Sequence, residues 1–445
     1  MTQSITATFT NLTRLHTAAK RDGQLCFNNL MHFVTENMLS KAYGALNRKA
    51  AEGVDGESWK SYGENLPLKL KDLCQRLHKN CYKPQPVKRI WIPKSNGQER
   101  PIGITSLEDK IVQQVLVWIL ESIYENDFLG FSYGFRPKRN QHRALDAVYM
   151  AITVKKVSWV LDADIQGFFD NINHEWMMKF LGHRISDPRI LRLIKSTLKA
   201  GVVDQGCKSR TVVGTPQGAV ISPLLGNIYL HYVLDLWVQQ WRQRHARGEV
   251  YVVRYADDTV FCFQYKADAE RFQKAFSERL ADFKLTVNQD KTQLIEFGRF
   301  AELNRRVRKA GKPQTFDFLG FTHICSRRRS NNSFTVKRKT ISKRQRGKLN
   351  SIKQVLKKNY HKKPVDIGKW LKVVVQGYFN YYAVPGNTMV LDSFRTAVIR
   401  MWIKSMRRRS QKGKTVPWRR FKRLIEYFIP QARVMHPYPN QRLCV

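Results

Sequence analysis

Acidic residues stand at two places where apolar segments of the chain end. In VVRYADDTVFCF, residues 252–263, the adjacent Asp257 and Asp258 lie between two runs of β-branched and aromatic residues. Upstream, Asp162 and Asp164 close the apolar segment KVSWVLDADI. Mg²⁺ is usually held by one or two carboxylates together with substrate phosphates. A pair of such ions stabilises both the attacking and the leaving oxygen of an in-line phosphoryl transfer.

Each acidic pair also has a structural interpretation. Ala256, Asp257 and Asp258 fit a hairpin tip whose carboxylates are solvated, and Asp162 or Asp164 fits a cap of the helix that follows. Spacing alone does not decide between Asp162 and Asp164. The order of the segments favours a metal-binding catalytic site over the structural interpretation. A hairpin that carries Lys and Arg comes first, and the strand that ends in Asp follows it. A Gly-rich turn with a glutamine follows, and the Asp-Asp hairpin comes about ninety residues after the first aspartates.

Hydrophobic periodicity and turn residues predict the elements that position these side chains. Residues 1–85 are expected to be mostly helical, and Asn173 is expected to cap a helix. We predict a polar, basic linker at 326–348 and a basic loop at 132–141. Strands are predicted in 87–106 (a hairpin), 156–165, 250–263 (a hairpin), 286–297 and 316–324. Helices are predicted in 108–128, 214–241, 267–285, 349–360, 366–383, 388–409 and 417–428.

The charge of the chain is strongly and unevenly positive. It has 78 Lys and Arg against 35 Asp and Glu among 445 residues, a formal net charge of +43. Residues 318–445 contain 31 of these cations and only three acids. An excess of this size implies a polyanionic partner, with nucleic acid preferred to a membrane surface.

Cysteine usage and hydropathy exclude several classes of protein. The seven cysteines are scattered without a CxxC pair, which argues against a zinc knuckle or a disulfide framework. No apolar core of a signal peptide and no run of eighteen apolar residues is found. We therefore expect a reduced protein of the bacterial cytoplasm, without a membrane span, and leave association with the nucleoid open.

Several blocks together resemble a known family. IPKSNGQERPIGI, SYGFRP, LDADIQGFFDNI, GTPQGAVISPLLGNIYL, RYADD, LTVNQDKT and FDFLGF are similar, in that order, to successive blocks of group II intron-encoded reverse transcriptases. VVVQGYFNYYAVPGN resembles the maturase (thumb) region of the same family. The resemblance implies an α+β right-hand polymerase fold, with fingers and palm built on an antiparallel sheet and an α-helical thumb.

The resemblance implies that Asp164, Asp257 and Asp258 are the catalytic residues, which bind two Mg²⁺ ions. The preference for Asp164 over Asp162 comes from the family alignment of DIQGFFD. The backbone carbonyl of Ile165 would also face a metal. Lys291 is a candidate for protonating the leaving pyrophosphate; the alternative is a surface lysine in a turn.

Five further residues are implied to contact the incoming nucleotide. Lys94 and Arg100 would reach the triphosphate, although a solvated basic hairpin is the ordinary alternative. Phe169 would sit under the sugar and clash with a 2′-hydroxyl, unless it is ordinary core. Gln217 would contact the nucleotide or the template, and Gly218 would allow close approach of the backbone.

The C-terminal region is expected to bind structured RNA. Aromatic residues beside basic helices suit stacked bases and phosphates, although about half of the aromatics at 378–382 are expected to form a core. Acids are nearly absent, so the dense basic clusters are better explained by contact with RNA than by ion pairs within helices. Binding of RNA through these clusters is expected to weaken as the salt concentration rises. The predicted RNA-binding residues are Arg407, Arg408, Arg409, Arg419, Arg420, Lys422 and Arg423.

We divide the chain into an N-terminal helical extension with the start of the fingers (1–85), fingers and palm (86–325) and a basic helical thumb (326–445), without a C-terminal endonuclease. The expected function is RNA-directed DNA synthesis from a dNTP on an RNA template with a DNA primer, together with binding of intron RNA to assist splicing and mobility. Two alternatives stay open: a splicing cofactor with incidental polymerase activity, and a reverse transcriptase adopted for phage defence or spacer acquisition.

Overall fold

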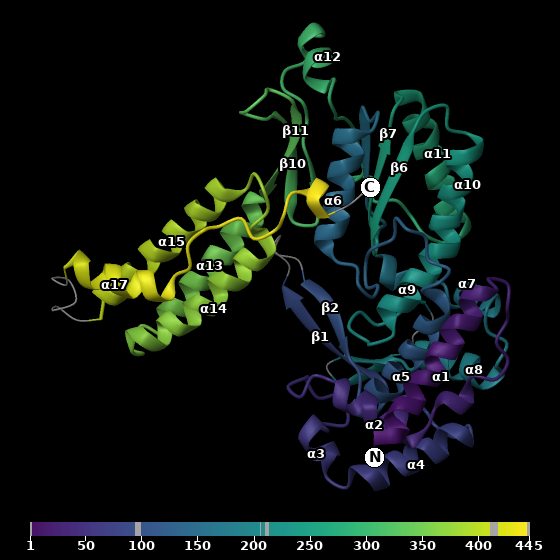
Figure 1. The fold of residues 1–445 in the computed structure, drawn as a ribbon. Helices are drawn as coiled ribbons and strands as arrows, with labels where there is room; N and C mark the ends of the chain where they lie inside the picture. The colour runs from purple at the N-terminus through teal and green to yellow at the C-terminus, as the bar shows by residue number, and fades with distance from the viewer. Residues whose placement is uncertain (1, 94–98, 205, 210–212, 410–416, 443–445) are drawn as a thin grey trace.

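An antiparallel sheet with the strand order β6-β7-β3-β8 lies beside helices α6, α10 and α11 (Figure 1). The computed structural model describes residues 2–93, 99–204, 206–209, 213–409 and 417–442. The strands of this sheet are β3 (Trp159–Ala163), β6 (Val250–Tyr255), β7 (Asp258–Phe263) and β8 (Gln293–Glu296). Both strands of the acidic hairpin therefore form as predicted, and the strand that precedes Asp164 pairs directly with one of them.

Both faces of this sheet are buried, because its strands carry apolar side chains on alternate sides. Leu161 and Phe261 point into the core of the N-terminal half, whereas Val160 and Val260 pack in a second core that includes α6. The helices near the sheet and in the N-terminal half are α5 (Leu107–Tyr124), α6 (Gln141–Val154), α7 (His174–Gly182), α8 (Pro188–Leu198), α9 (Ser222–Leu230), α10 (Leu236–Arg244) and α11 (Lys266–Asp282).

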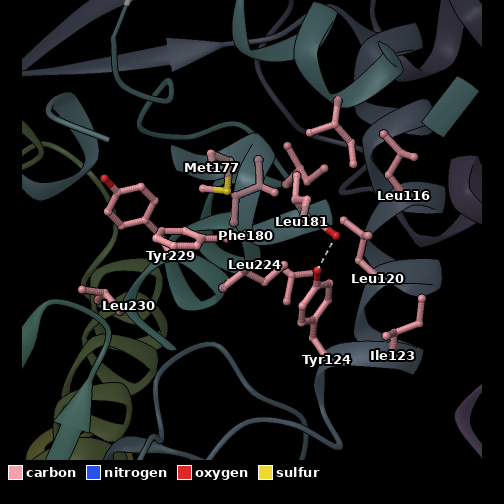
Figure 2. Close-up of a cluster of buried hydrophobic side chains, with 14 of the residues drawn as sticks. Leu116, Leu120, Ile123, Tyr124, Met177, Phe180, Leu181, Leu224, Tyr229 and Leu230 are labelled. Carbon is pink, nitrogen blue, oxygen red and sulfur yellow. Dashed lines mark hydrogen bonds between the residues drawn. The ribbon is translucent and has the colours of Figure 1, made fainter. Parts of the chain in front are cut away.

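Helices α5, α7 and α9 pack into one another below the sheet. Figure 2 shows Leu120 and Tyr124 of α5 close to Leu181 of α7 and Leu224 of α9, and the Tyr124 hydroxyl donates to the Leu181 carbonyl at 3.3 Å. As predicted, Asn173 caps α7, since its side chain accepts from two backbone N–H groups of the first turn. The N-terminal extension adds α1 (Thr2–Arg21), η1 (Met31–Phe33), α2 (Glu36–Ala45), α3 (Trp59–Gly63) and α4 (Leu66–His78).

A second sheet has the order β2-β1-β4-β5 and contains the predicted basic hairpin. Its parallel β1–β4 pairing joins the hairpin to the chain just after α8. The sequence analysis assigned no element to α6, α8, β4 or β5. The strands are β1 (Val87–Pro93), β2 (Glu99–Ile104), β4 (Val202–Asp204) and β5 (Cys207–Ser209).

The prediction of a linker at 326–348 is wrong. The segment contains the end of β10 (Phe321–Arg327), the strand β11 (Phe334–Thr340) and the start of α13 (Ser342–Lys358). The single strand predicted at 316–324 is likewise two strands, β9 (Phe316–Phe318) and β10, which turn at Leu319 and Gly320. The basic composition is typical of a linker, but Arg338 of β11 is buried against Asp146, which lies 192 residues earlier.

The long helix predicted within 214–241 is interrupted. It starts at Ser222, passes through a π-helical turn, η3 (His231–Asp235), and continues as α10. Asp235 in this turn pairs with Arg254 of β6, a tertiary contact that helical periodicity does not encode. π-helical turns are frequent at functional sites.

The C-terminal helices form an arm with its own core, built around side chains such as Leu371, Phe394 and Trp402. Tyr378 and Phe379 belong to this core, as expected for about half of the aromatics there. The arm consists of α13, α14 (Pro364–Tyr382), α15 (Thr388–Arg407) and α17 (Trp418–Phe428). The chain then returns along the arm to α6 (Figure 1) and ends in α18 (Pro439–Arg442). The remaining short helices are η2 (Phe168–Asp170) and α12 (Ala301–Val307).

Within the described residues, none of the helices combines the length and the apolar character needed to cross a bilayer. The six cysteines that the structure describes are unpaired thiols.

Candidate active site

The adjacent aspartates lie at the tip of the β6–β7 hairpin, where Tyr255 pairs with Asp258. The turn between them contains Ala256 with a φ of +57°, a left-handed conformation that costs energy in a residue with a Cβ. Tight hairpins of this kind need a positive φ in the turn to match the twist of the strands. The surrounding structure must therefore hold Ala256 and Asp257 in place.

The register of the sheet brings the upstream aspartate to the same point. Ala163 of β3 pairs with Thr259 of β7, so the next position along the ladder sets Asp164 opposite Asp258. Antiparallel neighbours have Cα atoms about 4.5–5.5 Å apart. The three predicted catalytic aspartates, from positions far apart in the chain, thus converge at one end of the sheet.

Burial and repulsion from neighbouring carboxylates raise the pKa values of Asp257 and Asp258. Burial, followed by Asp257 and Asp164, raises the pKa of Asp258 from 3.8 to about 6, against the opposing charges of Arg344 and Lys291. Burial and Asp164 also raise the pKa of Asp257. Although its neighbours crowd it, the Asp258 side chain is open to solvent. Like charges held together at an accessible point are what a divalent cation neutralises, and the all-oxygen donor set suits Mg²⁺.

Asp162 is a fourth carboxylate beside this group. It pairs with Val260 and lies within β3, before the strand ends. Burial, then Asp258, Asp164 and Asp317, raise its pKa to about 7. The pKa of Asp162 is therefore raised further than that of Asp258.

Asp164 is held by two residues of the segment that follows α11. Its Oδ2 accepts from Lys291 Nζ at 2.7 Å and from Asn288 Nδ2 at 3.1 Å. The Asn288 N–H also donates to the Asp164 carbonyl at 2.8 Å. Among the described residues, no three His, Cys, Asp or Glu side chains are arranged to enclose a metal ion. An ion bound through Oδ2 of Asp164 would replace the hydrogen bond from Lys291 at that atom.

A buried arginine supports the tip of the β6–β7 hairpin. The sequence did not predict this role. Arg254 is fully buried and binds both carboxylate oxygens of Asp235, at 2.7 and 2.6 Å. Its Nη1 donates to Asn227 Oδ1 and to the Ala256 carbonyl, each at 3.0 Å. Arg254 thus fixes the strained residue that precedes Asp257. The signal in the sequence was a cation inside an otherwise apolar strand, next to the acidic pair.

The SYGFRP loop packs against the same turn. The backbone of Arg254 exchanges hydrogen bonds with Phe131 and Tyr133, at 2.9 and 2.8 Å. A Cβ on Gly134 would lie 2.3 Å from the Ala256 nitrogen, so only glycine allows this approach. Asn227 Nδ2 donates to the Gly134 carbonyl at 2.7 Å, which ties the loop to the Arg254 network.

The predicted nucleotide-binding residues lie on several elements. Phe169 is half-buried in η2, and its carbonyl accepts from the Thr215 N–H at 2.8 Å. Gln217 Nε2 lies 3.3 Å from Asp170 Oδ2, at the edge of a cavity of about 290 Å³. Gly218 has a φ of +110°, and a Cβ there would meet the Gly103 carbonyl at 2.7 Å. The predicted close approach is therefore to strand β2.

Three other predicted site residues are placed as follows. Ile165 is buried and forms a bridge with Val287. Arg100 is exposed on β2, opposite Ile92. Lys94 lies outside the described residues.

The predicted RNA-binding residues lie near the end of the helical arm. Arg408, Arg419, Lys422 and Arg423 are exposed, and Lys422 lies 3.9 Å from Glu426. Arg407 stacks over Phe421, with 5.6 Å between its guanidinium carbon and the ring centre. Arg409 donates to the His361 carbonyl at 3.4 Å. The side chain of Arg420 is outside the described part of the chain.

Comparison with known proteins identifies the family of the chain. The family profile described as reverse transcriptase (RNA-dependent DNA polymerase) matches residues 92–323, about half of the chain. The chain belongs to the reverse transcriptase family. Its relatives include proteins named as group II intron-encoded, which confirms the resemblance seen in the sequence.

Three relatives illustrate this likeness. Protein YkfC of Escherichia coli is 36% identical over 317 residues, which cover 63% of this chain and 83% of the relative. The group II intron-encoded protein LtrA of Lactococcus lactis is 41% identical over 180 residues, 40% of this chain and 30% of LtrA. The putative COX1/OXI3 intron 1 protein of Saccharomyces cerevisiae is 30% identical over 225 residues, 50% of this chain and 27% of the relative. The chain thus spans less than a third of these two intron-encoded relatives.

Proposed function

We propose that the protein synthesises DNA on an RNA template, with Asp164, Asp257 and Asp258 holding two Mg²⁺ ions. The observation that carries this proposal is the convergence of the three carboxylates, which the β3–β7 register supports. The raised pKa values of Asp257 and Asp258, to which Asp164 contributes, agree with it. When bound, such ions stabilise the attacking and leaving oxygens of an in-line displacement. The primer 3′-hydroxyl attacks the α-phosphate of a dNTP, and pyrophosphate leaves.

Lys291 is suited to protonate the leaving pyrophosphate. Its hydrogen bond with Asp164, opposed by desolvation, raises the pKa of Lys291, so the ammonium form is favoured. Its side chain is two-thirds exposed and can leave Asp164. Basic groups near the triphosphate neutralise charge that develops in the transition state, and Lys94 and Arg100 have this role in the proposal.

Phe169, Gln217 and Gly218 complete the nucleotide site in the proposal. The half-buried ring of Phe169 excludes a 2′-hydroxyl and so favours deoxynucleotides. Gln217 contacts the base pair from the turn beside η2. The carbonyl of Ile165 adds one oxygen to the metal site.

We assign the segments of the right-hand arrangement as predicted from the sequence: fingers beginning in 1–85, fingers and palm in 86–325 and a thumb in 326–445. The separate core of the helical arm supports an independent thumb. The exposed cations at its end, and the net charge of the chain, support binding of intron RNA during splicing and mobility. LtrA and other relatives are named as intron proteins, which favours intron RNA as the partner.

Replacement of Asp257 and Asp258 by Asn tests the proposal. The change keeps side-chain volume but removes two metal ligands, and primer extension is expected to fall by about 10³-fold or more, since the metals supply several kcal/mol. Binding of the cognate intron RNA and its splicing should persist. Asp317→Asn is the matched control, because this exposed carboxylate lies near Asp162 but outside the triad. Undiminished extension by the double variant would refute the polymerase site, and joint loss of splicing would refute two separable functions.

A further inference from the structure

A second cavity, of about 930 Å³, lies outside the acidic site. Its walls are the β10–β11 hairpin, the start of α15 and the last helix, α18, and none of the three catalytic aspartates lines it. In Figure 1, α15 and the β10–β11 hairpin enclose an angle on one side of the arm, whereas β1 and β2 lie on the other side. Its volume is at the upper end of the range for ligand sites, roughly 300–1,000 Å³.

The lining of this basic cavity carries cations and no acids. Six of its residues, 327–329 and 337–339, are Arg or Lys. Two of the six have ion partners, since Arg338 binds Asp146 at 2.8 Å and Arg327 binds Glu302 at 3.1 Å. The other four, Arg328, Arg329, Lys337 and Lys339, have no hydrogen-bonded or ionic side-chain partner in the part of the chain that the structure describes. Their charges repel one another unless an anion lies between them.

Lys337 and Lys339 project from the same face of β11, because they are two residues apart in a strand. Val336 and Thr340 of β11 are buried, so Lys337 and Lys339, which alternate with them, project to the opposite side. Arg328 and Arg329 follow β10, just before the chain returns as β11. The four cations therefore come from two parts of one hairpin, namely Arg328 and Arg329 from its turn and Lys337 and Lys339 from its second strand.

The opposite wall offers groups that recognise more than charge. The N-terminal end of α15 carries no acidic residue in its first turn, and its Thr388 lines the cavity. Asn387 uses its side chain on Thr340 instead of capping the helix. Gln441 adds a further polar side chain to the lining, and the Tyr438 ring is 56% exposed there. Hydroxyl and amide groups can pair with ribose 2′-hydroxyls, and an aromatic face can stack on a base.

We propose that the basic cavity binds the sugar–phosphate backbone of an RNA segment that is separate from the template in the acidic site. This inference rests on the proposed function for the choice of RNA as the polyanion. The position of the cavity lets one protein hold a folded RNA on one side of the arm while it copies RNA on the other.

The test compares Lys337→Ala/Lys339→Ala with Lys155→Ala/Lys156→Ala, which removes two exposed lysines elsewhere on the chain. The acidic site is first filled with a chain-terminated template–primer and the next dNTP. Binding of a labelled RNA hairpin is then measured by anisotropy over a series of salt concentrations. We expect the Kd to rise roughly tenfold and the salt slope to fall by about two for the first variant only. Arg328→Ala/Arg329→Ala should give the same result from the other side of the hairpin.

Extension of oligo(dT) on poly(rA) by the same variants separates the two proposals. Extension should match the wild type in every variant, because none of these residues belongs to the acidic site. If extension is normal and both cavity variants bind the hairpin as the control does, the cavity inference is wrong. If a DNA hairpin or an acidic peptide binds as well as RNA, the assignment to RNA is overturned. Absence of extension by the wild-type protein would instead refute the proposed polymerase.

Discussion

Arg254→Lys is expected to slow DNA synthesis without removing any residue that touches substrate. The change keeps the buried positive charge beside Asp235, so no carboxylate is left unpaired in the core. A single ammonium group cannot reproduce the fork that binds Asp235 twice and also reaches Asn227 and the Ala256 carbonyl. The left-handed Ala256, and with it Asp257, then loses its support.

The expected loss of stability follows from the four hydrogen bonds that the Arg254 side chain makes. Lysine can retain about two of them, and hydrogen bonds of charged groups contribute about 1.5–3 kcal/mol each. We expect the free energy of unfolding to fall by about 3–6 kcal/mol, from the loss of about two such bonds. Displacement of a catalytic group by about 1 Å can cost about 10²-fold in rate, so kcat should fall between about 10- and 100-fold. The Mg²⁺ concentration for half-maximal activity should rise, because Asp257 is less well aimed.

Arg184→Lys is the matched control. Arg184 is also buried, pairs with Asp127 at 3.0 Å and donates to the carbonyls of Ala19, Asp22 and Leu25. It lies far from the acidic hairpin in the fold, so its replacement should cost comparable stability with little change in kcat. The assays are chemical denaturation and steady-state primer extension over a range of Mg²⁺ concentrations.

One outcome would contradict a role of Arg254 in aiming Asp257. If Arg254→Lys loses stability as the control does but keeps the wild-type kcat and Mg²⁺ dependence, then Arg254 is an ordinary core residue. The hairpin tip would then be held by its own turn and by the SYGFRP loop alone.

Two further predictions concern the nucleotide and the metal. Phe169→Val should raise incorporation of ribonucleotides relative to deoxynucleotides by roughly tenfold or more, measured as the ratio of kcat/KM values; an unchanged ratio would make Phe169 a packing residue only. Because the pKa of Asp258 is raised in the folded protein to about 6, the metal-free fold binds more protons than the unfolded chain between about pH 4 and 6. Metal-free stability should therefore fall as the pH rises through that interval, and Asp162, whose pKa is raised to about 7, should extend the fall to about pH 7. The increase in Tm on adding Mg²⁺ should grow between about pH 4 and 6. Asp258→Asn should weaken both trends, because only Asp162 and Asp257 then titrate with raised pKa values. Trends as large in this variant as in the wild type would contradict the assignment.

Much of the acidic site could be predicted from local sequence. The runs of β-branched and aromatic residues around Asp257 and Asp258 specify two strands with a tight turn, and that turn exposes the carboxylates. Asn173 predicted the start of a helix, because an N-cap side chain binds backbone N–H groups only two or three residues further along the chain. Such features depend on interactions over a few residues, and composition and spacing record them.

Other features were missed because their partners are remote. The basic composition of strand β11 predicted a linker. Arg338 can be buried there because its charge pairs with Asp146, which lies far upstream in the chain. The π-helical turn that carries Asp235 follows from its pairing with Arg254, not from helix periodicity. The SYGFRP loop has no pattern that reveals its backbone contacts with the acidic hairpin.

The sequence by itself determined the family, the acidic residues of the hairpin and the excess of positive charge, because each is a property of residue type and order. Only the tertiary structure decided which aspartate lies opposite Asp258, which arginine holds the turn and where unpaired cations line a cavity. Strand register, burial of an ion pair and convergence of like charges depend on distances between segments that the chain brings together only when it folds.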